Sequence, residues 1–437
     1  MSLYQLERDR DLAELVETLK RSEDPPIRKR AAEVIGGLFE NDEFDEADLV
    51  VEGDTPDDPL LEADAERETV IDVLVGVVSE DDSEAVRAAA IDALDHHGQE
   101  SLERLVDELS DEDLQSAADW VAARAFAEVL TDEQPELRMA AATGLGRVGD
   151  PSVTAALVSR LSDPDARVRA RSATACGRIG DPRAVEALES RLREDPDVDV
   201  RTAAAAALGE IGTEASLRIL LAASDDGSES VRRVIADALG EFGSVDPVDT
   251  LVDYLEDDRE TVRRTAMFSM VEILSNAPPQ RSHDVREAAA DRLGSATADE
   301  VIPPLSEILT KSSGAPQRRN AAWLLGRVVG SEHERTARDA LLEALGDDDG
   351  MTAQFAATSL TRLSAPGLEA DLLGLARDGE ADREARSKAL FVLGKVGDDS
   401  AREELGEFVD RTDDDALREA AFAALSKLGG IGGGGAR

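Results

Sequence analysis

The sequence predicts an all-α solenoid, an array of stacked two-helix repeats, and three observations lead to this fold class. Similar segments recur with a period of about 31–32 residues. Inside each segment the apolar residues recur at helical spacing, and no segment alternates with period two for long enough to predict a strand. Alanine and leucine must fill the core, because aromatic residues make up 3% of the 437 residues while 42% are hydrophobic.

The repeat is clearest in four successive segments: "ELRMAAATGLGRVGDP", "RVRARSATACGRIGDP", "DVRTAAAAALGEIGTE" and "SVRRVIADALGEFGSV". A glycine steps through them by 31, 32 and 31 residues, at Gly146, Gly177, Gly209 and Gly240. Five arginines keep the same period: Arg138, Arg169, Arg201, Arg232 and Arg263. The pattern resumes in "PQRRNAAWLLGRVVG", "EARSKALFVLGKVG" and "ALREAAFAALSKLGG". Self-similarity at this period indicates a repeat architecture rather than a local active site.

Each repeat is expected to contain two helices. In "DPDARVRARSATACGRIG", Asp163 is the predicted N-cap and Pro164 the first helical residue. Gly177 would allow close helix packing, and Gly180 would end the helix. The second helix then starts at Asp181 and Pro182. Two such short helices cannot bury their apolar faces alone, so neighbouring repeats must stack into a solenoid.

Four segments are expected along the chain: an N-terminal helical repeat at 1–39, an acidic flexible insertion at 40–66, the solenoid at 67–428 and a disordered Gly-rich tail at 429–437. The alternative for 40–66 is a docked element that uses Leu49, Val50, Val51, Leu60 and Leu61. Between Arg263 and Arg318 the step is 55 residues instead of 62, which predicts an irregular repeat there.

The charge and composition of the chain limit the classes of function that it can have. Asp and Glu number 95 against 48 Lys and Arg, six of them lysines, for a net charge of −47. Such a surface suits molar salt, which shortens electrostatic repulsion to about 3 Å. It argues against nucleic acid or an anionic membrane as a partner. No apolar run reaches roughly 18 residues and the N-terminus lacks a signal peptide, so a soluble cytoplasmic protein is expected.

No residue set predicts catalysis, a cofactor or a metal. The single cysteine, Cys176, stands where sister repeats have leucine, which favours a packing role. The adjacent His96 and His97 point in different directions on a helix and lack a partner at metal-ligand spacing. The acidic run "GDDDG" at 346–350 does not follow a calcium-loop pattern. The periodic arginines predict a structural ladder paired with acidic residues of the neighbouring turn, rather than an anion site.

The pattern D-P-x-x-x-V-R-x-x-A-x-x-A-L-G-x-I-G-D-P resembles the HEAT-like repeat of the phycobilisome-lyase type, over roughly 70–430 and most clearly at 135–270. The resemblance implies an α-solenoid. Family members include bilin-attachment lyases, an iron hydroxylase and scaffolds, among them archaeal taxis adaptors. The hydroxylases use several His-Glu dipeptides, whereas this chain has one, His333-Glu334. With the acidic composition, the resemblance implies a halophilic archaeal source.

The favoured function is therefore a non-catalytic scaffold or adaptor that holds a protein partner, and archaeal taxis is the most specific role that the resemblance implies. The alternative is an enzyme of the family type, such as a bilin lyase. The oligomeric state stays open.

A candidate binding surface follows from helix geometry. Positions one and five residues after each ladder arginine point away from the core. In early repeats they hold small residues, but later they become charged or aromatic. The predicted surface, suited to an acidic protein partner, comprises Arg233, Arg264, Phe268, Arg319, Trp323, Phe355 and Phe391. In the alternative interpretation, irregular helices around 275–310 cover Phe268 and Trp323, and Arg233 pairs with Asp237.

Overall fold

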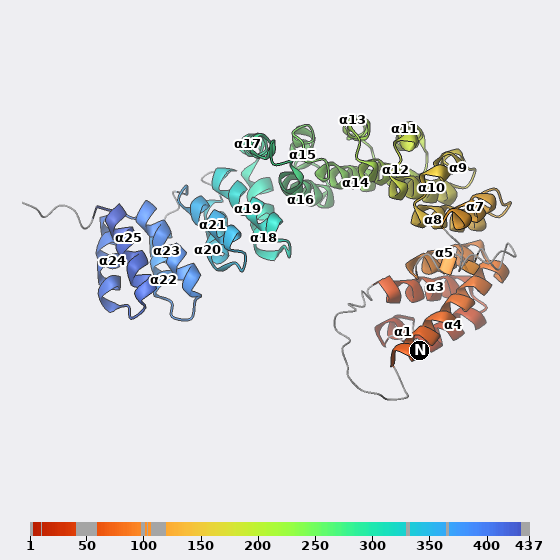
Figure 1. The fold of residues 1–437 in the computed structure, drawn as a ribbon, viewed down its shortest axis with the longest axis horizontal. Helices are drawn as coiled ribbons and strands as arrows, with labels where there is room; N and C mark the ends of the chain where they lie inside the picture. The colour runs from red at the N-terminus through yellow and green to blue at the C-terminus, as the bar shows by residue number, and fades with distance from the viewer. Residues whose placement is uncertain are drawn as a thin grey trace, which may run out of the picture. The chain divides into compact units, whose positions relative to one another are not determined.

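The computed structural model describes residues 3–9, 11–40, 59–97, 101–102, 104–105, 119–328, 333–363 and 367–429. These residues form helices joined by short turns, and no strand is present among them (Figure 1). None of the described helices is long and apolar enough to cross a membrane. An all-α fold is confirmed.

Two of the predicted segments fall largely outside the described residues: the insertion at 40–66 and the tail at 429–437. The prediction was wrong at one end of the insertion, because helix α4 begins at Pro59 rather than after residue 66. A proline at the first helical position needs no N–H partner there, so it is a favourable start.

The chain divides into two compact units, Met1–Ile219 and Leu220–Arg437. In the first unit a row of first helices packs side by side, and each carries a second helix against it. The first helices are α3 (Pro25–Glu40), α5 (Glu84–His96), α8 (Pro135–Val148), α10 (Ala166–Ile179) and α12 (Val198–Ile211). The remaining helices are α1 (Leu3–Asp9), α2 (Leu12–Arg21), α4 (Pro59–Glu80), α7 (Asp119–Val129), α9 (Thr154–Arg160) and α11 (Val185–Glu194).

The second unit repeats this arrangement, and α13 (Glu214–Ala222) spans the boundary between the units. Its first helices are α14 (Glu229–Gly240), α16 (Glu260–Asn276), α19 (Ala315–Val328), α21 (Gly350–Leu360), α23 (Arg383–Val396) and α25 (Asp415–Lys427). The others are α15 (Val248–Tyr254), α17 (Ser282–Leu293), α18 (Ala298–Lys311), α20 (Glu334–Glu343), α22 (Leu368–Arg377) and α24 (Asp399–Arg411).

The irregular repeat predicted from the 55-residue step is confirmed. Two helices, α17 and α18, stand between α16 and α19, whereas a single α-helix stands between α14 and α16 and between α19 and α21. Helix α17 packs on α15 and α16, whereas α18 packs mainly on α19 and α20. Helix α18 also contains Pro303 and Pro304 within its length.

The turn before α10 corrects one expectation. Asp165, not Asp163, is the N-cap, and its side chain accepts a hydrogen bond from the N–H of Arg167. Asp163 is occupied elsewhere, because it accepts from the Asp165 N–H and from Arg138. At the other end Gly180 has a φ of 69°, a left-handed conformation that glycine adopts without strain and that ends the helix as predicted.

Glycines near the ends of the first helices allow adjacent helices to pack in backbone contact, as predicted for Gly177. A Cβ on Gly177 would lie 2.7 Å from Ala207 Cα of the next first helix. The same relation recurs between Gly146 and Ala175 and between Gly394 and Ala424. Real Cβ atoms do not approach a backbone atom this closely, so these positions accept no side chain.

Gly394→Ala is expected to lower the free energy of unfolding by about 1–3 kcal/mol, because its Cβ would lie 2.7 Å from the Ala424 Cα. The matched control is Gly374→Ala in α22, where nothing lies within 4 Å of the added Cβ. That change should stabilise by up to about 1 kcal/mol, since alanine favours helix over glycine. Urea unfolding in molar KCl measures both. Equal effects in the two variants would contradict the packing role.

Candidate interaction surface

The predicted ladder is present, but it is interrupted at Arg263, which within the described residues contacts the Asp257 carbonyl oxygen and no carboxylate. In five repeats an arginine near the start of a first helix makes two hydrogen bonds to an aspartate that precedes the next first helix, and the pairs are Arg28–Asp81, Arg138–Asp163, Arg169–Asp195, Arg232–Asp257 and Arg318–Asp347. The nitrogen–oxygen distances lie between 2.7 and 3.0 Å. A further hydrogen bond ties each arginine to the backbone of its own turn, as at Arg169 Nη1 and Asp163 O, 3.0 Å.

These pairs are buried and hold the repeats together. The Asp195 side chain is fully buried, and that of Arg169 is 11% exposed. Burial by itself raises the pKa of Asp195, but the Arg169 hydrogen bonds and charge and the Asp197 N–H outweigh it, so this pKa lies below its ordinary value. The guanidinium groups are thus neutralised inside the array.

Cys176 and His97, two of the groups that could suggest catalysis, are buried. Cys176 is a free, fully buried thiol, and burial raises its pKa to about 12, so the prediction of a packing cysteine is confirmed. Burial lowers the pKa of His97 to about 4, which leaves its imidazole neutral at neutral pH. Its neighbour His96 is exposed and points elsewhere. In the described part of the chain, no group of three or more His, Cys, Asp or Glu residues is arranged to hold a metal ion.

The predicted outward surface is partly exposed. Arg233, Arg264, Phe268 and Phe391 are exposed, whereas Arg319 and Trp323 are half-buried. The structure brings Arg319 against Asp349, with Nε 2.6 Å from Oδ2, and this pair holds the pKa of Asp349 well below its usual range.

One residue of the predicted surface was assigned wrongly. Phe355 is half-buried, and Ser359, its expected outward companion, is 3% exposed and donates a hydrogen bond to the Ala322 carbonyl oxygen. The outward positions of α21 are one residue earlier, at Gln354 and Thr358, which are both exposed. The error arose because α21 has Ala353 where other first helices have the ladder arginine, so the sequence register slipped by one.

Arg264 and Phe268 line a groove in the second unit, with a volume of about 530 Å³. Its opposite wall is α18, which contributes Pro304, Glu307 and Ile308. Arg264 Nη2 lies 3.3 Å from Glu307 Oε1, and 61% of its side chain remains exposed. The irregular helix therefore stands beside Phe268 without covering it, and Phe268 is 37% exposed.

The other aromatic residues of this surface lie beside cations. The guanidinium carbon of Arg327 lies 3.4 Å from the centre of the Trp323 ring, and Lys427 Nζ lies 4.6 Å from the centre of the Phe391 ring. Arg327 and Lys427 were not among the predicted residues. Both stand nine residues after the ladder position of their helix, one helical turn beyond the predicted outward position.

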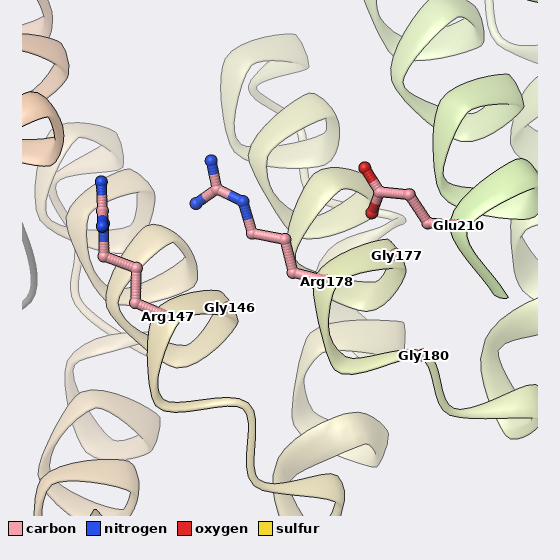
Figure 2. Close-up of a pocket in the computed structure, with 6 residues that line it drawn as sticks. All are labelled: Gly146, Arg147, Gly177, Arg178, Gly180 and Glu210. Carbon is pink, nitrogen blue, oxygen red and sulfur yellow. The ribbon is translucent and has the colours of Figure 1, made fainter. Parts of the chain in front are cut away.

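Figure 2 shows the residues nine positions after the ladder arginine in three first helices of the first unit. Arg147, Arg178 and Glu210 come from the successive helices α8, α10 and α12 and lie in a row along a shallow pocket of about 720 Å³. Arg147 forms an ion pair with Asp95, and Arg178 Nη2 lies 3.7 Å from the same carboxylate. Burial raises the pKa of Glu210, and the charge of Arg178 partly offsets this effect.

A second groove in the first unit, of about 510 Å³, lies where sequence reasoning found only small outward residues. Ala170 and Thr174 do line it, but Arg167 and Arg171 border it. These two arginines form ion pairs with Glu84 and Asp92 of α5, which lies beyond α8. The sequence signal that could have revealed this groove is an arginine three residues before each outward position, Arg167 before Ala170 and Arg171 before Thr174.

Comparisons with known proteins identify the architecture. A family model of HEAT repeats matches residues 123–209 and 185–272. The HEAT repeat-containing taxis protein OE_2401F of Halobacterium salinarum is 42% identical over 430 residues, which cover 98% of this chain and 99% of that protein. The chain belongs to the HEAT-repeat family. The resemblance found in the sequence is thereby confirmed, and so is the α-solenoid of this HEAT-repeat protein.

Solved structures similar to this HEAT-repeat protein have low TM-scores. The CpcE–CpcF complex of phycocyanin lyase from Nostoc sp. PCC7120 is 19% identical, covers 70% of this chain and 94% of its own, and has a TM-score of 0.34. Importin beta is 16% identical, the match covers 96% of this chain and 61% of importin beta, and the TM-score is 0.38. Human deoxyhypusine hydroxylase is 19% identical, the match covers 72% of this chain and 99% of the hydroxylase, and the TM-score is 0.26.

Proposed function

We propose that this protein is a non-catalytic, cytoplasmic adaptor in archaeal taxis that holds an acidic protein partner. The observation that carries the proposal is the whole-length similarity to the Halobacterium salinarum taxis protein, 42% identity over nearly all of both chains. The second support is the distribution of side chains. Ladder arginines are neutralised internally, whereas Arg264, Phe268 and Phe391 remain exposed on an otherwise acidic chain.

Exposed aromatic residues flanked by cations are favoured anchors for protein partners. The groove beside Arg264 and Phe268 supplies both kinds of group within one concave surface. A partner from the same salt-rich setting would carry acidic residues, which suit such a surface.

The test is complementation. A Halobacterium salinarum strain that lacks its own HEAT repeat-containing taxis protein is expected to regain directed swimming when it expresses this chain. The control is a strain with the empty vector, and immunoblotting confirms that the chain accumulates. A strain that accumulates the folded chain and still fails to respond to attractants would contradict the taxis role.

A further inference from the structure

The ninth position after the ladder residue changes charge along the chain. It holds Glu210, Glu241 and Glu272 in three successive first helices. At the C-terminal ends of the last four first helices of the second unit, α19, α21, α23 and α25, it holds only cations: Arg327, Arg362, Lys395 and Lys427, of which Arg362 lies two residues beyond the end of α21. We call these four residues the cationic row. Two of the six lysines of the chain belong to it.

The second unit brings members of this row near one another. Burial lowers the pKa of Arg327, and the charge of Arg362, just beyond the end of the next first helix, lowers it further. Helices α19, α21, α23 and α25 pack in sequence, each against the next (Figure 1). The same helical position forms a visible row of side chains in the first unit (Figure 2).

Three of the four cations of this row have no carboxylate partner among the described residues. Arg362, Lys395 and Lys427 are exposed, and within the described residues no carboxylate lies within 4 Å of any of them. Arg327 is 3.8 Å from Glu287. Other cations of the same repeats do form ion pairs on the second helices, where Arg377 contacts Glu404 and Arg411 contacts Glu407.

Helix geometry alone does not explain the row. A cation near a helix C-terminus interacts favourably with the helix dipole, by about 0.3–1 kcal/mol. However, Glu210 occupies the same position in the last turn of α12, so the position does not demand a cation. An aromatic surface accompanies the charges, because Phe391 is exposed beneath Lys427 and Trp323 lies against Arg327.

We propose that the cationic row, together with Phe391, binds an acidic extended segment of a partner protein. That the partner is a protein rests on the adaptor function proposed above. Charge complementarity selects the segment, because three unpaired cations stand on a chain with a net charge of −47. Three steps between packed helices, each about 8–10 Å, span roughly 24–30 Å. An extended segment of about eight or nine residues covers this length.

The probe is a fluorescein-labelled twelve-residue peptide of Asp and Glu with two leucines, and its control replaces the acids with Asn and Gln. Fluorescence anisotropy in molar KCl, with the full chain, is expected to show binding of the acidic peptide alone. The triple variant Arg362→Glu, Lys395→Glu, Lys427→Glu should raise the Kd at least about tenfold. The charge-matched variant Arg377→Glu, Arg402→Glu, Arg411→Glu, on the second helices of the same repeats, should leave the Kd nearly unchanged.

Circular dichroism verifies the fold of each variant, and Arg362→Gln, Lys395→Gln, Lys427→Gln replaces the reversal variant if the latter does not fold. Equal weakening by both triple variants would overturn the proposal, and so would binding of the amide peptide with the same Kd. A single-stranded DNA of equal charge that binds while the peptide does not would assign the row to nucleic acid and would also overturn it. The complementation test does not depend on these binding measurements, so none of these results decides whether the adaptor function is correct.

Discussion

Dialysis into about 10 mM salt is expected to abolish most of the helical circular dichroism of this protein, and molar KCl is expected to restore it. The chain carries 95 carboxylates against 48 cations. Their repulsion extends over about 30 Å at this ionic strength but about 3 Å in molar salt. Glu241 and Glu272 illustrate the repulsion. Burial raises the pKa of Glu272, and the charge of Glu241 on the neighbouring first helix raises it further.

The salt effect can be separated from a general effect of solute. Sucrose at the same osmolality excludes itself from the protein surface but does not screen charge, so it should restore much less of the helical signal than KCl. Thermal unfolding at several KCl concentrations gives the dependence of the Tm on ionic strength. An unchanged Tm and full helicity at about 10 mM salt would contradict the prediction.

Asp195→Ala is expected to lower the free energy of unfolding by about 3–5 kcal/mol at pH 7 in molar KCl. The change leaves the Arg169 guanidinium buried without its carboxylate, and an uncompensated buried charge costs this much. Urea unfolding measures the effect. The matched control is Asp258→Ala, which also removes a contact to a ladder arginine, Arg232, but from a carboxylate that is 77% exposed. The control should cost about 1 kcal/mol or less.

Two further measurements identify the cause. The double variant Arg169→Met, Asp195→Leu removes both charges and should recover much of the lost stability. Lowering the pH should also narrow the difference between wild type and Asp195→Ala. The folded pKa of Asp195 lies below its ordinary value of about 3.9, so its contribution is complete above that pH and is lost as the pH falls through the folded pKa. A difference that stays constant down to pH 3 would show that the ion pair is not responsible.

Periodicity was sufficient to predict the helices, the ladder and the packing role of Gly177, because each depends on contacts repeated with the same spacing. It failed where a repeat departed from the pattern. Helix α21 has Ala353 at the ladder position and Thr361 where most other first helices have glycine, so its register could not be aligned and Phe355 was misplaced. The N-cap of α10 was missed because Asp163 is bound by Arg138, which lies 25 residues away.

The binding surface was harder to predict than the fold. Many side chains are compatible with a solvent-exposed position on a helix, so exposure at an outward position does not identify a binding residue. The cationic row stands near helix C-termini, where a cation also has a local role, and its sequence signal was therefore ambiguous. The groove beside Phe268 depends on where α18 packs, which the irregular step of 55 residues does not reveal.

The ladder also determines how the array responds to mechanical tension. Repeats joined by Arg–Asp pairs are elastic elements in series, and the weakest element yields first when the chain is pulled. In the second unit, among the described residues, the pair is absent at three ladder positions: Arg263, Ala353 and Arg386, which contacts the Ala376 carbonyl oxygen. Within the described residues Arg263 contacts the Asp257 carbonyl oxygen without a carboxylate partner, and Ala353 has no charge at all. Extension of this unit should therefore begin at one of these unpaired positions, whereas the repeat that contains Arg318 keeps its pair with Asp347 and should resist extension longer.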